Sequence, residues 1–203
     1  MKIGVVDYEA GNLRSVETAL FHLGADYTVS GNPETVLGSD RIIFPGVGEA
    51  RAAMETLRSR GLDEALVEFA ARGKLLLGIC IGCQIALEHS EERDTKCLGL
   101  VPGRVKKFDA GKGYKVPHMG WNEVFRNRKD PLFDGIPQGS SFYFVHSYYP
   151  EAADAEYELC YTEYINRFSS CIRKDNVYAV QFHPEKSGIF GLRLLENFLG
   201  LPG

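Results

Sequence analysis

The sequence predicts an α/β fold in which a mostly parallel central sheet is flanked by helices and gains antiparallel strands in the C-terminal half. Short apolar runs alternate with helical segments in the first half of the 203 residues, a pattern typical of a parallel sheet covered on both faces. From about Leu98, glycine, proline and aspartate separate short β-like runs, which favours mixed or antiparallel pairing. A chain of this length fits a single domain, which we expect to span residues 1–203.

Four strands and two helical stretches are expected in the first half. The first helix is capped by Asn12 and stops at Gly24, with apolar residues recurring at helical spacing between them. The second helical stretch covers residues 49–72 and is interrupted at Gly61. The four strands are residues 3–7, residues 27–30, residues 41–44 and the apolar run that follows Lys74.

The second half contains less regular elements. Residues 177–182 predict a strand that ends immediately before His183, and residues 189–199 predict a closing amphipathic helix. Earlier β-like runs lie at residues 101–108, 142–145, 157–161 and 169–173.

Composition and charge argue against several classes of function. The formal net charge of -4 and a pI near 5.8 give no general attraction to polyanions, so we expect no nucleic-acid partner. The most apolar run, residues 75–81, is far shorter than the roughly 20 residues that cross a bilayer. The first residues lack the features of a signal peptide, so we expect a cytoplasmic protein without membrane contact. Five cysteines in such a chain are interpreted as reduced thiols.

Cys80 is the first candidate for chemistry. It lies in Gly78-Ile79-Cys80-Ile81-Gly82 after an apolar strand, and the flanking glycines are typical of a strand-turn-helix elbow that presents a nucleophile. The amides and dipole of the following helix favour the thiolate. On this motif alone, a buried structural cysteine or a Cys-x-x-Cys pair with Cys83 stays open. Zinc would require a second such pair, but the other cysteines are isolated in the sequence: Cys97, Cys160 and Cys171.

His183-Pro184-Glu185 offers a base and an acceptor that can orient it. A cysteine nucleophile needs an imidazole to move its proton, and the imidazole needs an acceptor to fix its tautomer. Pro184 favours an extended backbone at His183, and in an extended segment residues two apart project to the same side, so Glu185 can reach the imidazole. A surface turn after a strand is the alternative interpretation of the run by itself.

Pro45-Gly46-Val47-Gly48 is a loop in which two glycines let backbone amides approach a substrate closely. In combination with the elbow and the His-Pro-Glu run, it completes three motifs in a fixed order. Here the sequence resembles the class I (triad) glutamine amidotransferases over nearly its whole length. That resemblance implies a flavodoxin-like fold.

Four further runs narrow the resemblance to the glutaminase subunits of imidazole glycerol phosphate synthases: residues 7–13, 115–122, 143–148 and 181–188. The resemblance implies a subunit that hydrolyses L-glutamine and passes ammonia to a separate (β/α)₈ cyclase subunit in histidine biosynthesis. It implies a heterodimer, and no metal or organic cofactor. Glutaminases of other pathways share the elbow and the distal histidine, so a paralogue with another role stays open. A non-catalytic regulatory subunit would be expected to lack a triad member.

The resemblance also assigns roles to single residues. It makes Cys80 the nucleophile, His183 the general base and acid, and Glu185 the residue that orients the imidazole. The amides of Val47 and Ile81 become candidates for the oxyanion site. The glutamine pocket is expected to be lined by Gly48, Gln84, Glu88, Ser147 and Tyr148. Cys83 departs from the family, where methionine or histidine is usual at this position.

Residues 115–122 are expected to face the cyclase and the ammonia exit. The segment combines proline, glycine and the only tryptophan of the chain, and its candidate contacts are His118, Met119, Trp121 and Asn122. Tryptophan is a common interface anchor. The alternative is that Trp121 anchors a loop to the core.

Overall fold

The computed structural model describes residues 1–9 and 13–202, and a single large sheet forms its centre. Within these residues the main sheet has nine strands in the order β2-β1-β3-β4-β13-β12-β11-β8-β9. Parallel pairing joins β2 (Tyr27–Ser30), β1 (Ile3–Val6), β3 (Arg41–Gly46), β4 (Leu75–Cys80) and β13 (Val177–Val180). Antiparallel pairing adds β12 (Arg167–Lys174), β11 (Glu158–Glu163), β8 (His118–Arg126) and β9 (Ser140–His146). The predicted mixed sheet is confirmed.

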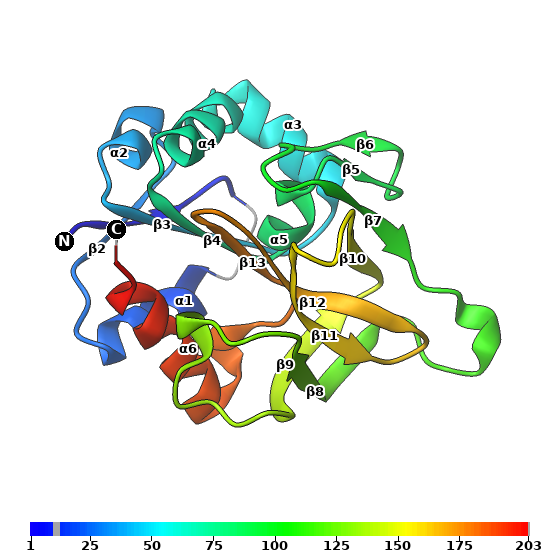
Figure 1. Cartoon of the computed structure of the whole chain (residues 1–203). Coiled ribbons are helices and arrows are strands. Elements are labelled where there is room, and N and C mark those ends of the chain that lie inside the picture. Colours follow the sequence, from blue (N-terminus) through cyan, green and yellow to red (C-terminus); the bar gives the residue numbers. More distant parts are fainter. Residues whose placement is uncertain (10–12, 203) are drawn as a thin grey trace.

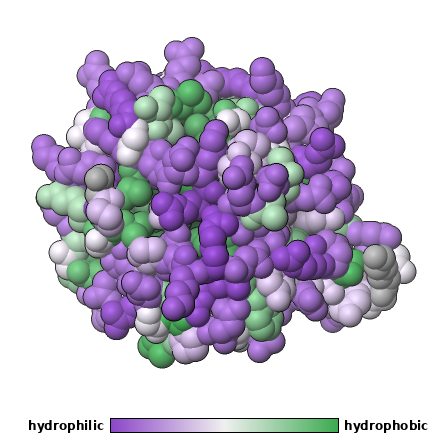
Figure 2. Space-filling view, in the orientation of Figure 1, coloured by the Kyte–Doolittle hydropathy of each residue, from purple (hydrophilic) through white to green (hydrophobic). Residues whose placement is uncertain are grey.

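A smaller sheet packs beside the antiparallel half. Its order is β10 (Tyr148–Ala152), β7 (Gly103–Lys107), β5 (His89–Ser90) and β6 (Thr95–Lys96). Residues after β7 project from the body of the molecule before the chain enters β8 (Figure 1). Hydrophilic side chains dominate the face of the molecule shown in Figure 2.

Helices cover the parallel strands on both faces (Figure 1). One face is covered by α1 (Leu13–His22) and α6 (Gly188–Gly200), and the other by α2 (Pro33–Leu37), α3 (Ala50–Ser59) and α4 (Leu62–Ala71). Side chains of a strand alternate between these two cores. In β3, for example, Ile43 belongs to the core with α1 and α6, whereas Ile42 and Phe44 belong to the other.

Two local features of the first half have physical causes that can be named. Gly61 adopts φ +68°, which separates α3 from α4 at the predicted interruption. Helix α2 was not anticipated, because its five residues are too few for a periodic pattern; Asn32 caps it by accepting hydrogen bonds from Glu34 N and Thr35 N. The predicted cap of the first helix, Asn12, lies outside the described residues.

The segment 115–122, expected to be a loop, becomes a strand from His118 onward. Strand β8 pairs with β9 over seven register positions, from His118 opposite His146 to Val124 opposite Ser140. The glycine and proline of this segment suggested a loop, but pairing with a distant strand supplies the hydrogen bonds that local sequence does not reveal.

The carboxyl ends of three neighbouring parallel strands meet at one edge of the sheet. Gly46 at the end of β3 lies opposite Cys80 at the end of β4, and Val180 of β13 lies opposite Ile79. In open α/β sheets this edge is where ligands bind. Among the described residues, no helix is long and apolar enough to cross a membrane.

Candidate active site

Cys80 lies at a sharp turn between strand β4 and helix α5 (Ile81–Ala86). Its backbone adopts φ 56° and ψ -106°, a conformation that costs a non-glycine residue about 1–3 kcal/mol. The turn packs directly on the neighbouring strand, since a Cβ atom on Gly82 would lie 1.9 Å from the carbonyl oxygen of Phe44. The thiol-bearing residue is therefore held in a strained position by a contact that only glycine permits.

His183 and Glu185 are brought together by a short 3-10 turn. The turn η3 (Pro184–Lys186) follows β13, and His183 Nδ1 lies 2.8 Å from Glu185 Oε1. Both side chains are buried, with 1% and 2% of their surface exposed. The pair was expected on the same side of an extended segment. His183 is extended as predicted, but the 3-10 turn after it brings the carboxylate back to the imidazole.

The backbone around His183 is fixed from two sides. His183 N donates to Tyr143 O of strand β9, and the hydroxyl of Ser187 donates to His183 O. Ser187 Oγ also accepts a hydrogen bond from Tyr143 N. Helix α6 closes on this turn, because a Cβ atom on Gly191 would lie 1.9 Å from Pro184 O. The imidazole is thus positioned by main-chain contacts on both sides.

The surroundings of His183 favour its protonated form. Burial lowers the pKa of His183, but the neighbouring Cys80 and Glu185 raise it more, and the net effect brings it from 6.5 to about 10. Because Glu185 can only accept, it keeps a hydrogen on Nδ1. Within the described residues His183 Nε2 makes no hydrogen bond, so this nitrogen is available for proton transfer.

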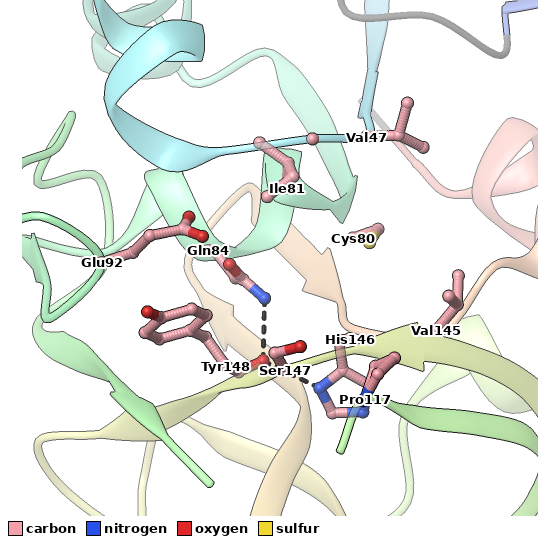
Figure 3. A pocket seen from close by; sticks show the side chains of 11 residues that line it. Val47, Cys80, Ile81, Gln84, Glu92, Pro117, Val145, His146, Ser147 and Tyr148 are labelled. Carbon is pink, nitrogen blue, oxygen red and sulfur yellow. Dashed lines mark hydrogen bonds between the residues drawn. The ribbon is translucent and has the colours of Figure 1, made fainter.

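A cavity of about 290 Å³ opens beside Cys80 (Figure 3). Most of the residues expected to hold the substrate or its oxyanion line it, namely Val47, Gly48, Ile81, Gln84, Ser147 and Tyr148. The Gln84 amide nitrogen and His146 Nδ1 both donate to the backbone carbonyl of Tyr148, at 2.9 and 2.8 Å (Figure 3). The elbow and the glycine loop therefore meet at one pocket at the edge of the sheet, whereas His183 and Glu185 do not line it and reach the site through Cys80.

Glu88, expected in this pocket, does not line it. Its carboxylate accepts a hydrogen bond from Gly103 N and lies in a separate surface hollow. The reason is that α5 ends at Ala86, so Glu88 does not share a helical face with Gln84. The acidic residue of the pocket is instead Glu92, whose Oε2 accepts from Ala50 N. No motif in the sequence marked Glu92, which follows the short strand β5.

Gln181 is a second residue that the sequence motifs did not single out by itself. It is fully buried immediately before Phe182 and His183, and its amide nitrogen lies 3.7 Å from Cys80 Sγ. Its position two residues before His183 is the sequence signal that could have identified it as part of the site.

Two further histidines form a buried pair at the start of β8 and the end of β9. His118 Nδ1 lies 2.8 Å from His146 Nε2, and His118 Nε2 lies 3.2 Å from the side-chain nitrogen of Asn122. The Tyr148 carbonyl can only accept, so His146 carries its hydrogen on Nδ1 and accepts on Nε2. His118 then donates from Nδ1 and accepts from Asn122. Every hydrogen in this chain of bonds is accounted for when both rings are neutral.

Burial keeps this pair uncharged. It lowers the pKa of His118 to about 4. Burial also lowers the pKa of His146 to about 3; the bond to Tyr148 opposes this, and the nearby His118 and His183 reinforce it. His118 was expected at a partner surface, but alternation along β8 turns it inward. The neighbouring Met119 and Trp121 are 63% and 59% exposed, so Trp121 does not anchor the segment to the core.

The chain is similar over its whole length to one family of proteins. It matches the family model described as glutamine amidotransferase class-I over residues 4–200. It is 48% identical over 201 residues to imidazole glycerol phosphate synthase subunit HisH of Nitrosococcus oceani, covering 97% of this chain and 96% of that protein. The HisH subunits of Bacillus cereus and Chromobacterium violaceum are 46% and 44% identical; the matches cover 98% and 100% of this chain and 94% and 99% of theirs.

Solved structures share the fold at lower identity. PurLQS from Thermotoga maritima superimposes with a TM-score of 0.76 at 21% identity, covering 98% of this chain and 97% of that one. The glutaminase domain of CTPS from Trypanosoma brucei gives a TM-score of 0.64 at 16% identity, covering 100% and 95%. At this identity the likeness concerns the fold alone.

Proposed function

The chain belongs to the class I glutamine amidotransferase family, and from this membership we propose that it is the glutaminase subunit of an imidazole glycerol phosphate synthase. It hydrolyses glutamine to glutamate and ammonia, and the ammonia serves the cyclase reaction of histidine biosynthesis. The observation that carries the chemistry is the placement of Cys80 and the His183–Glu185 pair after the ends of neighbouring strands, with His183 next to Cys80 and Cys80 lining the cavity.

The first chemical step is attack of the Cys80 sulfur on the carboxamide carbon of glutamine. The carbon–sulfur bond forms as the carbonyl electron pair moves to oxygen, and the amides of Val47 and Ile81 are the proposed donors to that oxyanion. His183, protonated by taking the thiol proton, gives a proton from Nε2 to the departing nitrogen. The carbon–nitrogen bond breaks, ammonia leaves and a γ-glutamyl thioester remains.

Hydrolysis of the thioester reverses these roles. The imidazole of His183, now neutral, accepts a proton from water, and the oxygen attacks the thioester carbon. The carbon–sulfur bond breaks, the thiol of Cys80 recovers a proton from His183, and glutamate is released. Glu185 holds the Nδ1 hydrogen through both half-reactions and stabilises each imidazolium.

The pocket fits the polar groups of an amino acid. Glu92 is its only carboxylate among the described lining residues, and we assign it to the α-ammonium group of glutamine. Both hydrogens of the Gln84 amide nitrogen are used, by Tyr148 O and Gln181 Oε1. The amide oxygen of Gln84 is therefore the atom left to accept a hydrogen bond from the substrate. Gly48 and the Ser147 hydroxyl complete the proposed site.

We propose that the partner is a (β/α)₈ cyclase that binds over the exposed side of β8. Of the four expected contacts, Met119 and Trp121 present their side chains to solvent, and they support this surface best. His118 is buried, and Asn122 bonds to His118 and to Glu163 O, so these two shape the strand beneath the contact.

The proposal is tested by glutamate release from glutamine, measured with the cyclase and its ligand present. The Cys80→Ala protein is expected to lose activity on the order of 10⁴-fold or more, because nucleophile and base act as a unit. Cys97→Ser is the matched control, a buried thiol that lies outside the pocket, and should retain wild-type turnover. Undiminished glutamate release by Cys80→Ala would contradict the assignment. Failure of the cyclase to bind or use the ammonia would contradict the pathway while leaving the glutaminase intact.

A further inference from the structure

The buried side-chain amide of Gln181 contacts the Cys80 sulfur. Gln181 Nε2 lies 3.7 Å from Cys80 Sγ, and Gln181 Oε1 lies 2.9 Å from Gln84 Nε2. The residue is fully buried at the end of β13, where its backbone nitrogen donates to Ser170 O. It therefore connects the proposed nucleophile to the wall of the pocket.

The orientation of this amide follows from its neighbours. The backbone carbonyl of Tyr148 can only accept, so the Gln84 atom 2.9 Å from it must be the amide nitrogen. The same nitrogen also donates to the side chain of Gln181, so the accepting atom of Gln181 must be its amide oxygen. The nitrogen of Gln181 is thereby turned towards Cys80, and the sulfur faces a donor.

A donor at the sulfur and a base at the sulfur have different effects. The Gln181 amide gives a hydrogen bond but cannot accept the thiol proton, so proton transfer from Cys80 is left to His183 Nε2, which makes no other bond. A donor also stabilises negative charge on sulfur and holds the side chain in one direction.

We propose that Gln181 is a positioning residue for the nucleophile: its amide nitrogen holds and stabilises the Cys80 sulfur, while its amide oxygen fixes the orientation of Gln84. The inference rests on the proposed function for its role in catalysis. The contact itself is independent of substrate, so it can be tested without glutamine.

Gln181→Glu separates the two halves of this role. A protonated carboxyl group reproduces the amide, with one oxygen accepting from Gln84 and a hydroxyl donating to sulfur. An ionised carboxylate keeps the acceptor and replaces the donor by a negative charge. Gln181→Met is the matched control, because it fills a similar volume and has neither donor nor charge.

The measurement is the rate of Cys80 alkylation by iodoacetamide between pH 5.5 and 8.5, followed by peptide mass in the full chain. The other titratable groups around the sulfur, Tyr8, Cys83, His146, His183 and Glu185, are common to every protein compared, so each rate is divided by that of wild type. Circular dichroism and urea unfolding establish that each variant is folded.

For Gln181→Glu, we expect this ratio to fall at least 10-fold from the acid to the alkaline end of the range. For Gln181→Met, the ratio should be below one and should not fall as the pH rises. With glutamine, both variants should lose more in kcat than in KM. A folded Gln181→Glu protein with a constant ratio near one would overturn the proposal, even if Cys80→Ala abolishes glutaminase activity. Alkylation as expected without any glutaminase activity would support Gln181 and refute the proposed function instead.

Discussion

Two buried imidazole sites lie close together in this molecule, His183 and the His118–His146 pair. The first favours the protonated ring and the second favours neutral rings. His183 has its pKa raised to about 10, whereas the pKa values of His118 and His146 fall to about 4 and about 3. Depth does not explain the contrast, since the three side chains are 1%, 3% and 5% exposed. What differs is the group that each ring meets: a carboxylate and a thiol for His183, but a carbonyl, a second ring and an amide for the pair.

The comparison shows that the direction of the hydrogen bonds around a histidine affects its charge as much as burial does. In the pair, each hydrogen bond has a donor on one side only, and a second proton on either ring would bring two N–H groups face to face. A charged His146 would also repel the imidazolium at His183, which itself lowers the pKa of His146. The neutral pair thus leaves the positive charge of the region on His183.

The largest expected effect comes from removing the carboxylate charge beside His183. Glu185→Gln keeps the shape but takes away the charge that raises the pKa of His183, and its amide can turn either an oxygen or an N–H to Nδ1, so the tautomer is no longer fixed. We expect kcat for glutamine hydrolysis to fall by about 10²- to 10⁴-fold. The unchanged fold is checked by urea unfolding. Near-wild-type turnover in Glu185→Gln would mean that the carboxylate does not orient the base.

The two sites should also give opposite pH dependences of stability. The low native pKa values of the pair mean that the unfolded chain binds more protons between about pH 4 and 6.5, so the stability they contribute is present above 6.5 and lost as pH falls. The raised pKa of His183 means the reverse, with stability lost as pH rises from about 6.5 to about 10. Each group contributes a slope of about 1.4 kcal/mol per pH unit within its window.

Urea unfolding from pH 4.5 to 9.5 measures both slopes. His146→Gln removes one titrating ring. The slope of the free energy of unfolding against pH on the acid side should therefore fall by about 1.4 kcal/mol per pH unit, while the slope on the alkaline side should not change. An acid slope unchanged in His146→Gln would show that carboxylates, and not the pair, cause the loss of stability.

The smallest expected effect is a change in the pKa of His118, produced by giving its ring a carboxylate neighbour like the one that His183 has. Asn122→Asp replaces the amide donor that faces His118 Nε2 by a carboxylate that accepts. We expect the pKa of His118 to rise by at least about one unit, as measured by NMR titration of its ring. Asn122→Ser, which can still donate, is the control and should leave the pKa low. A low value in Asn122→Asp would mean that burial alone sets the state of the pair.

Local sequence was sufficient for the parts of the site that are held by adjacent residues. The elbow around Cys80 depends on glycine flanks and an apolar run and lies where the sequence predicts it. The strand before His183 begins at Val177 as predicted but ends at Val180, two residues earlier than predicted. The contact between His183 and Glu185 was expected for the wrong reason, because a 3-10 turn and not an extended segment forms it.

Features that depend on distant pairing were beyond the sequence. The partnership of His118 with His146 exists because β8 and β9 pair in one register, and nothing within either segment specifies the other. The choice of Glu92 over Glu88 depends on where α5 ends, which varies with packing more than with propensity. Alternating burial along β8 also decides that Trp121 faces outward, and that requires knowing that the segment is a strand.

The tight backbone contacts at Gly82 and Gly191 bear on how this protein tolerates random change. Neither glycine lines the pocket, yet a single added methyl group at either would meet a main-chain oxygen at 1.9 Å. A saturation library scored by growth without added histidine would therefore show both as intolerant positions that do not line the pocket. Gly82 allows the close packing that positions the Cys80 sulfur, and Gly191 allows the packing that positions the His183 imidazole. Their intolerance would therefore identify backbone contacts that orient the reactive groups.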